Sequence, residues 1–171
     1  DFWLKADKPF MFLNGCLEWA KVVGASMSEE GGFWSSLPIA FDGSCNGIQH
    51  FSAMFLDTEG ANAVNLVDSE IPSDVYKEVG LRAKAMAERS NAGVNKLIQK
   101  YSEETDGAVF GRKVAKRSTM CLPYGVSKRS SNAYVYETVD EVLKKSSITA
   151  KEAKSVRTRI GSLIWDAIGE V

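Results

Sequence analysis

Residues 112–125 (RKVAKRSTMCLPYG) restrict the possible fold of this chain more than any other stretch. Arg112, Lys116 and Met120 are spaced four residues apart, so a helix would place their side chains along one face. Pro123 lacks a backbone N–H and disfavours helical geometry at the residue before it. The stretch therefore predicts a helix that breaks just before the tyrosine that follows this proline.

The same region carries a local excess of positive charge. The whole chain of 171 residues has a formal net charge of −1, yet residues 112–129 contain six cations and no acid. Such a patch is typical of a phosphate-binding surface, even on a protein that is close to neutral overall. A basic helix face that is simply solvated is the alternative interpretation of the same spacing.

A second informative stretch is residues 41–50 (FDGSCNGIQH). The short apolar run at 37–41 predicts a buried strand, the letters DGS predict a turn, and 46–56 predicts the following helix. This strand–turn–helix unit would place Asp42 at the carboxyl end of a strand, where open α/β sheets usually bind ligands.

Asp42 has two interpretations from the residues alone. Carboxylate oxygens are ligands that Mg²⁺ prefers, and phosphoryl transfer uses them to hold metal ions against the substrate. The sequence Asp-Gly-Ser is equally suited to cap the N-terminus of a helix. The basic helix later in the chain favours metal binding.

Residues 41–54 (FDGSCNGIQHFSAM) resemble motif A of the single-subunit RNA polymerases of the bacteriophage T7 type, a family that includes the mitochondrial enzymes. Residues 112–125 resemble motif B of the same family, and the two motifs follow in the family's order. The resemblance extends weakly to residues 4–20 and 162–166, and it covers only the middle part of a much longer enzyme. It implies a DNA-directed RNA polymerase, a nucleotidyltransferase that copies a DNA template into nascent RNA from ribonucleoside triphosphates with two Mg²⁺ ions.

For catalysis, the resemblance implies roles for Asp42, Lys116 and Tyr124. Asp42 and the backbone carbonyl of Gly43 would bind metal, and Lys116 would neutralise the leaving pyrophosphate and donate a proton to it. Tyr124 would sense the sugar 2′-hydroxyl near the templating position; a core tyrosine with a satisfied hydroxyl is the alternative. His50, the only histidine, matches the family motif. It would support the side chains that contact substrate, or it would have a structural role.

The resemblance assigns substrate binding to five residues of motif B: Arg112, Lys116, Met120, Tyr124 and Gly125. The two cations would contact the triphosphate, and Gly125 would let the next helix approach closely. Related DNA polymerases usually carry a glutamate just after the motif A aspartate, where it blocks a ribose 2′-hydroxyl. Residues 43–46 contain no glutamate, so the resemblance implies ribonucleotides.

The family also has a second metal-binding aspartate, in a His-Asp motif downstream of motif B, and no His-Asp pair occurs in this chain. We therefore expect the chain to carry half of the metal site and to be inactive alone. It would be a fragment of a longer polymerase, or one subunit of a split one. Its place of action would be the host cytoplasm for a virus, or the mitochondrion as the alternative.

The expected fold is α/β but rich in helix. Residues 1–57 would form part of a polymerase palm, and residues 58–171 a helical fingers region. Apart from the two motifs, the apolar spacing predicts a largely buried helix at 10–23 and a short strand at 63–67. Further helices are expected at 73–89, 91–101, 127–143 and 147–168, the last with Thr149 as its cap.

Two other functions remain open. A non-catalytic nucleic-acid-binding module would use residues 112–129 for phosphates and would bind DNA or RNA with strong salt dependence. A structural domain of a larger assembly would bind neither. No membrane partner is expected, because no apolar run is long enough to cross a bilayer. The three cysteines show no spacing typical of a zinc site or a disulfide framework.

Overall fold

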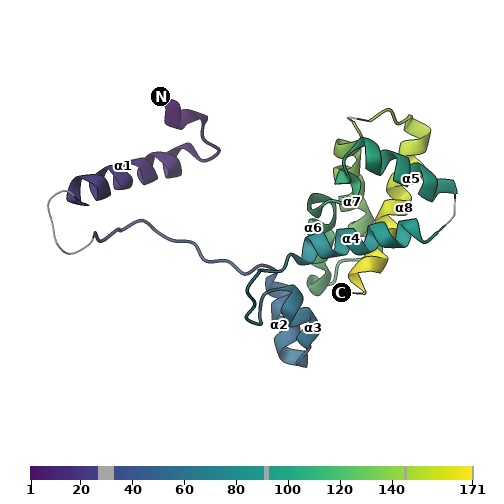
Figure 1. Cartoon of the computed structure of the whole chain (residues 1–171), viewed down its shortest axis with the longest axis horizontal. Helices are drawn as coiled ribbons and strands as arrows, with labels where there is room; N and C mark the ends of the chain where they lie inside the picture. The colour runs from purple at the N-terminus through teal and green to yellow at the C-terminus, as the bar shows by residue number, and fades with distance from the viewer. Residues whose placement is uncertain (27–32, 91–92, 145, 171) are drawn as a thin grey trace. The chain divides into compact units, whose positions relative to one another are not determined.

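The computed structural model describes residues 1–26, 33–90, 93–144 and 146–170 (Figure 1). These residues form α-helices, short 3₁₀ helices and connecting segments, and none of them forms a strand. None of the helices in the described part of the chain is both long and apolar enough to cross a membrane. The elements are η1 (Phe2–Lys5), α1 (Pro9–Ser26), α2 (Asn46–Phe55), α3 (Thr58–Ala63), α4 (Val75–Glu88), α5 (Gly93–Glu104), η2 (Ala108–Phe110), α6 (Arg112–Cys121), η3 (Leu122–Tyr124), α7 (Lys128–Leu143) and α8 (Ala150–Ile168).

The chain divides into two compact units, Asp1–Asp42 and Gly43–Val171. The first unit contains η1 and α1, and the elements from α2 to α8 belong to the second unit. The assignment of residues 1–57 to a palm and 58–171 to a fingers region remains a prediction.

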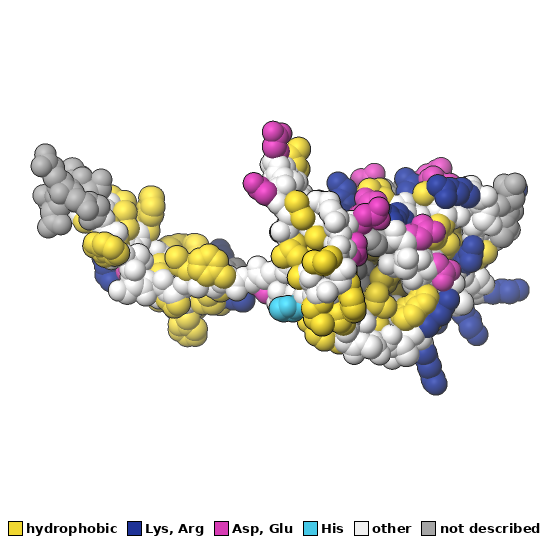
Figure 2. Space-filling model, turned by 90° about the horizontal axis from the view of Figure 1, so that it is seen from below, with side chains coloured by type: hydrophobic (Ala, Val, Ile, Leu, Met, Phe, Trp, Pro, Cys, Tyr) yellow, Lys and Arg dark blue, Asp and Glu magenta, His cyan; other side chains and the backbone are white. Residues whose placement is uncertain are grey.

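The first unit presents hydrophobic side chains on its surface (Figure 2). Its helix α1 covers the predicted helix at 10–23, but the prediction that this helix is largely buried is wrong. Phe10 is 78% exposed and Trp19 is 68% exposed. Phe2 packs edge-on against Phe12 at 5.9 Å between ring centroids. The few contacts of this kind do not enclose the helix, so its apolar side chains remain on the surface of the unit.

Glu18 connects α1 to the extended segment that ends the first unit. Its carboxylate accepts hydrogen bonds from the Ser35 hydroxyl at 2.8 Å and from the Ser36 backbone N–H at 3.2 Å. It also pairs with Lys21 one turn along the helix, at 3.2 Å. One carboxylate thus satisfies donors from two segments of the chain.

The two predicted strands are wrong. Residues 37–41 form no strand, and Phe41 is 91% exposed rather than buried. The segment 63–67 begins on the last residue of α3 and continues as a turn, in which Asn65 adopts a φ of 60°. A strand requires a neighbour for its backbone hydrogen bonds, and neither segment pairs with one among the described residues. The described residues therefore form a helical rather than an α/β fold, and of the strand–turn–helix unit they show only the turn and helix α2.

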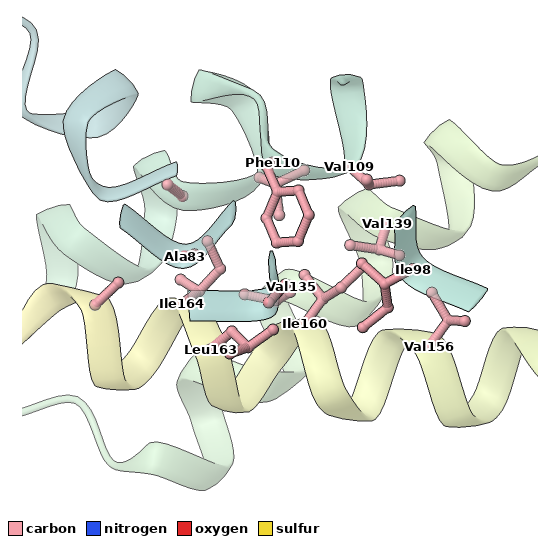
Figure 3. Packing of buried hydrophobic residues seen from close by; sticks show 14 of the residues in the cluster. Ala83, Ile98, Val109, Phe110, Val135, Val139, Val156, Ile160, Leu163 and Ile164 are labelled. Atoms are coloured by element: carbon pink, nitrogen blue, oxygen red, sulfur yellow. The ribbon is translucent and has the colours of Figure 1, made fainter. Parts of the chain in front are cut away.

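The core of the second unit lies between helices that are distant in sequence (Figure 3). Helix α8 packs against α4, α5 and α7, and α6 packs against α4 and α7. Burying one valine, leucine or isoleucine side chain contributes roughly 1.5–3 kcal/mol. Labelled members of this cluster are Ala83, Ile98, Val109, Phe110, Val135, Val139, Val156, Ile160, Leu163 and Ile164. This packing fixes the position of α6, the helix of motif B.

The starts of the helices follow from local sequence. The carboxylate of Asp74 caps α4 by accepting backbone hydrogen bonds in its first turn. Thr149 and Glu152 form a capping box at the start of α8, which confirms Thr149 as its cap.

The predicted helix at 91–101 is confirmed from Gly93 onward, and its first two positions lie outside the described residues. The helices predicted at 73–89, 127–143 and 147–168 are also confirmed.

Candidate active site

The turn before α2, residues 43–45, is held by hydrogen bonds from within the second unit. The Ser44 hydroxyl donates to the Val64 carbonyl at 2.5 Å. The Gln49 side-chain amide donates to the same carbonyl at 2.8 Å and to the Ser44 hydroxyl at 3.3 Å. The N-cap residue of α2 is Cys45. We call residues 43–45 the motif A turn.

Gly43 is the one position of this turn where a side chain could not be placed. A Cβ atom there would overlap the side-chain amide oxygens of Asn46 and Gln49. Two amide oxygens therefore lie next to Gly43, and oxygen atoms are the donors that Mg²⁺ prefers. Within the described part of the chain, no group of three or more acidic, cysteine or histidine residues is arranged so that it could hold a metal ion. A backbone carbonyl such as that of Gly43 is a ligand that suits a metal shared with carboxylates and substrate phosphates.

The motif B helix begins directly after Gly111, and its α-helical part ends at Cys121, slightly earlier than the predicted break just before Tyr124. Helix α6 is followed by the 3₁₀ turn η3 that contains Pro123. Gly125 then adopts a φ of 79°, a left-handed conformation that glycine adopts without strain. Apart from its two chain neighbours, no atom of the described residues lies within 4 Å of a Cβ built at Gly125, so the predicted close approach of the next helix is not seen there.

Most cations of residues 112–129, which we call the basic patch, are paired with carboxylates from other elements. Distances from side-chain nitrogen to carboxylate oxygen are 2.7 Å for Arg112–Asp74, 2.7 Å for Lys113–Glu141, 3.3 Å for Arg117–Glu137 and 3.3 Å for Lys128–Asp166. Hydrogen bonding from Lys113 lowers the pKa of Glu141. Lys116 and Arg129 have no carboxylate partner among the described residues. The patch is therefore far less positive in three dimensions than it is in sequence.

Lys116 lies instead above the ring of Tyr76, with its Nζ atom 5.9 Å from the ring centroid. The guanidinium of Arg112 lies 5.0 Å from the same centroid. The Tyr76 hydroxyl donates a hydrogen bond of 2.7 Å to the backbone carbonyl of Ser44. Tyr76 therefore connects the motif A turn with both cations that were predicted to bind triphosphate.

Tyr76 was not among the predicted site residues. It belongs to a small second core that also contains Cys45, Val64 and Val75, and only 4% of its surface is exposed. Burial raises the pKa of the Tyr76 hydroxyl well above its usual value, and hydrogen bonding with the Cys45 side chain adds to the increase. One sequence feature could have pointed to Tyr76: it lies in the first turn of the predicted helix at 73–89, two residues after Asp74. A buried tyrosine usually finds a hydrogen-bond partner for its hydroxyl.

Tyr124 and Met120 are on the surface, 72% and 41% exposed. The alternative in which Tyr124 is a buried core residue is therefore wrong. Its segment contacts the start of α2, because a Cβ atom at Gly47 would lie 2.6 Å from Pro123 Cβ and 3.4 Å from the Tyr124 ring. His50 is exposed on α2.

The structure thus brings Arg112, Lys116 and Tyr124 next to motif A residues of the second unit. Asp42, the predicted metal ligand, is the last residue of the first unit.

The contact at Gly47 gives a prediction about the junction of the two motifs. In Gly47→Ala the added methyl group would overlap the rigid ring of Pro123, so α2 or η3 must shift. We expect a loss of about 1 kcal/mol in the free energy of unfolding, because strain exceeds the gain in helix propensity. Urea denaturation measures this change, with Met54→Ala at an exposed site of the same helix as the control. Equal stability of Gly47→Ala and the native chain would show that this contact is loose.

Comparison with known proteins identifies the family. The family model described as DNA-dependent RNA polymerase matches residues 1–171. The chain is 31% identical to the DNA-directed RNA polymerase of Enterobacteria phage K11 and 32% identical to T7 RNA polymerase of Escherichia phage T7, with 98% of this chain aligned in both cases. It is 33% identical to the mitochondrial DNA-directed RNA polymerase of Homo sapiens over 82% of this chain.

This chain therefore belongs to the DNA-dependent RNA polymerase family, and the resemblance inferred from motifs A and B is confirmed. It spans about a fifth of the length of the phage relatives, 20% for K11 and 21% for T7, and 11% of the human mitochondrial relative.

Proposed function

We propose that this chain is the part of a DNA-directed RNA polymerase that receives the incoming ribonucleoside triphosphate. The observation that supports this most is that Lys116 is an exposed cation without a carboxylate partner among the described residues. Lys116 lies above the ring of Tyr76, and the hydroxyl of Tyr76 contacts the motif A turn. The positive charge of Lys116 is therefore not offset by a carboxylate and can attract a phosphate group. In the complete protein, DNA template and nascent RNA would be the partners, and the remaining parts of the polymerase would complete the site.

The chemistry assigned to each residue follows from its position. Lys116 and Arg112 would bind phosphate oxygens, and Lys116 would stabilise the leaving pyrophosphate. The exposed ring of Tyr124 would lie against the sugar and read its 2′-hydroxyl, and Met120 and Gly125 would border the same site. Asp42 and the Gly43 carbonyl would hold one of two Mg²⁺ ions, which when bound supply charge neutralisation at the phosphate oxygens. The second carboxylate would come from the rest of the polymerase.

The place of action would follow from the relatives. They are polymerases of phages and of mitochondria, so we propose the host cytoplasm or the mitochondrion.

Binding of ATP in the presence of Mg²⁺ tests this function, with titration calorimetry on the native chain and three variants. We expect Lys116→Ala to weaken binding about tenfold or more, because a charge-assisted hydrogen bond to phosphate is lost. Lys113→Ala is the matched control on the same helix, because Lys113 is already paired with Glu141. Asp42→Ala is expected to abolish the Mg²⁺ dependence of binding while leaving the far-ultraviolet circular dichroism spectrum unchanged.

Two results would contradict the proposal. A folded native chain that binds no nucleotide would remove the assigned site. Equal losses in Lys113→Ala and Lys116→Ala, with steeply salt-dependent binding of DNA, would indicate a general nucleic-acid-binding surface instead.

A further inference from the structure

Tyr76 is held at both ends of its side chain by groups from the two motifs. Its hydroxyl donates to the Ser44 carbonyl at 2.7 Å, and its ring lies beneath Lys116 and Arg112. Its backbone is fixed as well, because Tyr76 N–H donates to the carboxylate of Asp74 at 3.1 Å. That aspartate also pairs with Arg112 at 2.7 Å. The first turn of α4 therefore contacts both the motif A turn and two motif B cations.

The two kinds of cation partner in this region have different consequences. A carboxylate partner offsets the positive charge of a lysine or arginine and competes with a phosphate for its N–H donors. The face of an aromatic ring attracts an ammonium within about 6 Å through its quadrupole, and it leaves the net charge unchanged. Lys113 and Arg117 have the first kind of partner, and Lys116 has the second. A lysine held by a ring is thus both oriented and available to bind a phosphate.

We infer that Tyr76 is a positioning residue for triphosphate binding, which holds Lys116 in place without neutralising it and ties this cation to the motif A turn. This inference rests on the proposed function and assigns a role to a residue that the family motifs do not include. The phenol is suited to this role because it stays protonated at neutral pH. A phenolate would neutralise Lys116 and could no longer donate to Ser44.

A double-mutant cycle with Lys116 tests whether Tyr76 acts through this lysine. We expect Tyr76→Leu to weaken binding of Mg²⁺–ATP about threefold to tenfold, the range expected for loss of a cation–π contact together with the placement it gives. In the Lys116→Ala background, Tyr76→Leu should cause no further loss. Binding of AMP should change little in either background, because AMP lacks the β and γ phosphates.

Two further variants separate positioning from general packing. Tyr76→Phe keeps the ring, so it should retain ATP affinity, while amide hydrogen exchange in the motif A turn becomes faster because the bond to Ser44 is lost. Tyr134→Leu is the matched control, because the Tyr134 ring lies 4.0 Å from the Arg117 guanidinium at another tyrosine–cation pair. It should leave ATP affinity unchanged. Equal losses from Tyr76→Leu in both backgrounds would overturn the inference.

A second measurement does not depend on nucleotide binding. The ring current of Tyr76 should shift the ε-methylene protons of Lys116 upfield in the NMR spectrum of the native chain. Tyr76→Phe should keep this shift and Tyr76→Leu should remove it. A shift that persists in Tyr76→Leu would overturn the inference even if ATP binding is normal. Failure of the native chain to bind ATP would instead count against the proposed function, and the NMR shift would then decide whether Tyr76 places Lys116.

Discussion

Gly80→Ala is expected to lower the free energy of unfolding of the second unit by about 2–3 kcal/mol, although alanine forms helices better than glycine. Gly80 lies in the middle of α4, and a Cβ atom there would overlap the backbone carbonyl oxygen of Phe110. Phe110 belongs to η2, immediately before the motif B helix. A backbone carbonyl cannot rotate away as the end of a flexible side chain can, so α4 and η2 would have to separate.

Urea denaturation followed by circular dichroism measures this loss. Gly93→Ala is the matched control, because it makes the same substitution at the start of α5, where no described residue other than a chain neighbour lies within 4 Å of the added Cβ. The control should be neutral or slightly stabilising. If both variants have the same stability as the native chain, the close approach of α4 to η2 would be disproved. Because η2 leads directly into α6, we also expect Gly80→Ala to weaken nucleotide binding in the assay described above.

Asn95→Ala is expected to cost about 3 kcal/mol, the other large effect on stability. The Asn95 side chain is completely buried. Its amide group donates to the carbonyls of Ala87 at 3.0 Å and Ser90 at 3.3 Å, and its oxygen accepts from Arg159 Nε at 3.2 Å. Removing this side chain would leave three buried or partly buried polar groups without their partner and would open a cavity.

The same urea titration measures the cost of Asn95→Ala, with Asn62→Ala on the surface of α3 as the control for the change in composition. The control is expected to lie within about 0.5 kcal/mol of the native chain. A cost below about 1 kcal/mol for Asn95→Ala would mean that water replaces its hydrogen bonds.

The helices of the second unit were predictable because their signals are local. Apolar spacing defined α4, and the capping residue Thr149 marked the start of α8. The strands were not predictable, because a short apolar run such as 37–41 becomes a strand only if another segment pairs with it. Burial of α1 was misjudged for the same reason, since apolar composition indicates that a helix needs a partner but does not supply one.

The candidate site was predictable only in part. The spacing of Arg112, Lys116 and Met120 correctly placed them on one helix. The role of Tyr76 was hidden because its partner Ser44 is 32 positions away in sequence, and only packing brings the two together. The basic patch was overestimated because its neutralising acids, such as Asp74 and Glu141, come from other helices.

The pairing of four of the six patch cations has a consequence for how this surface treats long polyanions. A nucleic acid strand binds a basic surface partly because protein cations displace the counterions around its phosphates. A cation contributes fully to this gain only if it is not already paired with a carboxylate. A cation that already holds a carboxylate must exchange one anion for another, so it contributes little to this gain. We therefore expect a nucleic acid strand to gain little affinity from the four paired cations of this surface. A compact polyphosphate would instead bind at Lys116, which has no carboxylate partner among the described residues.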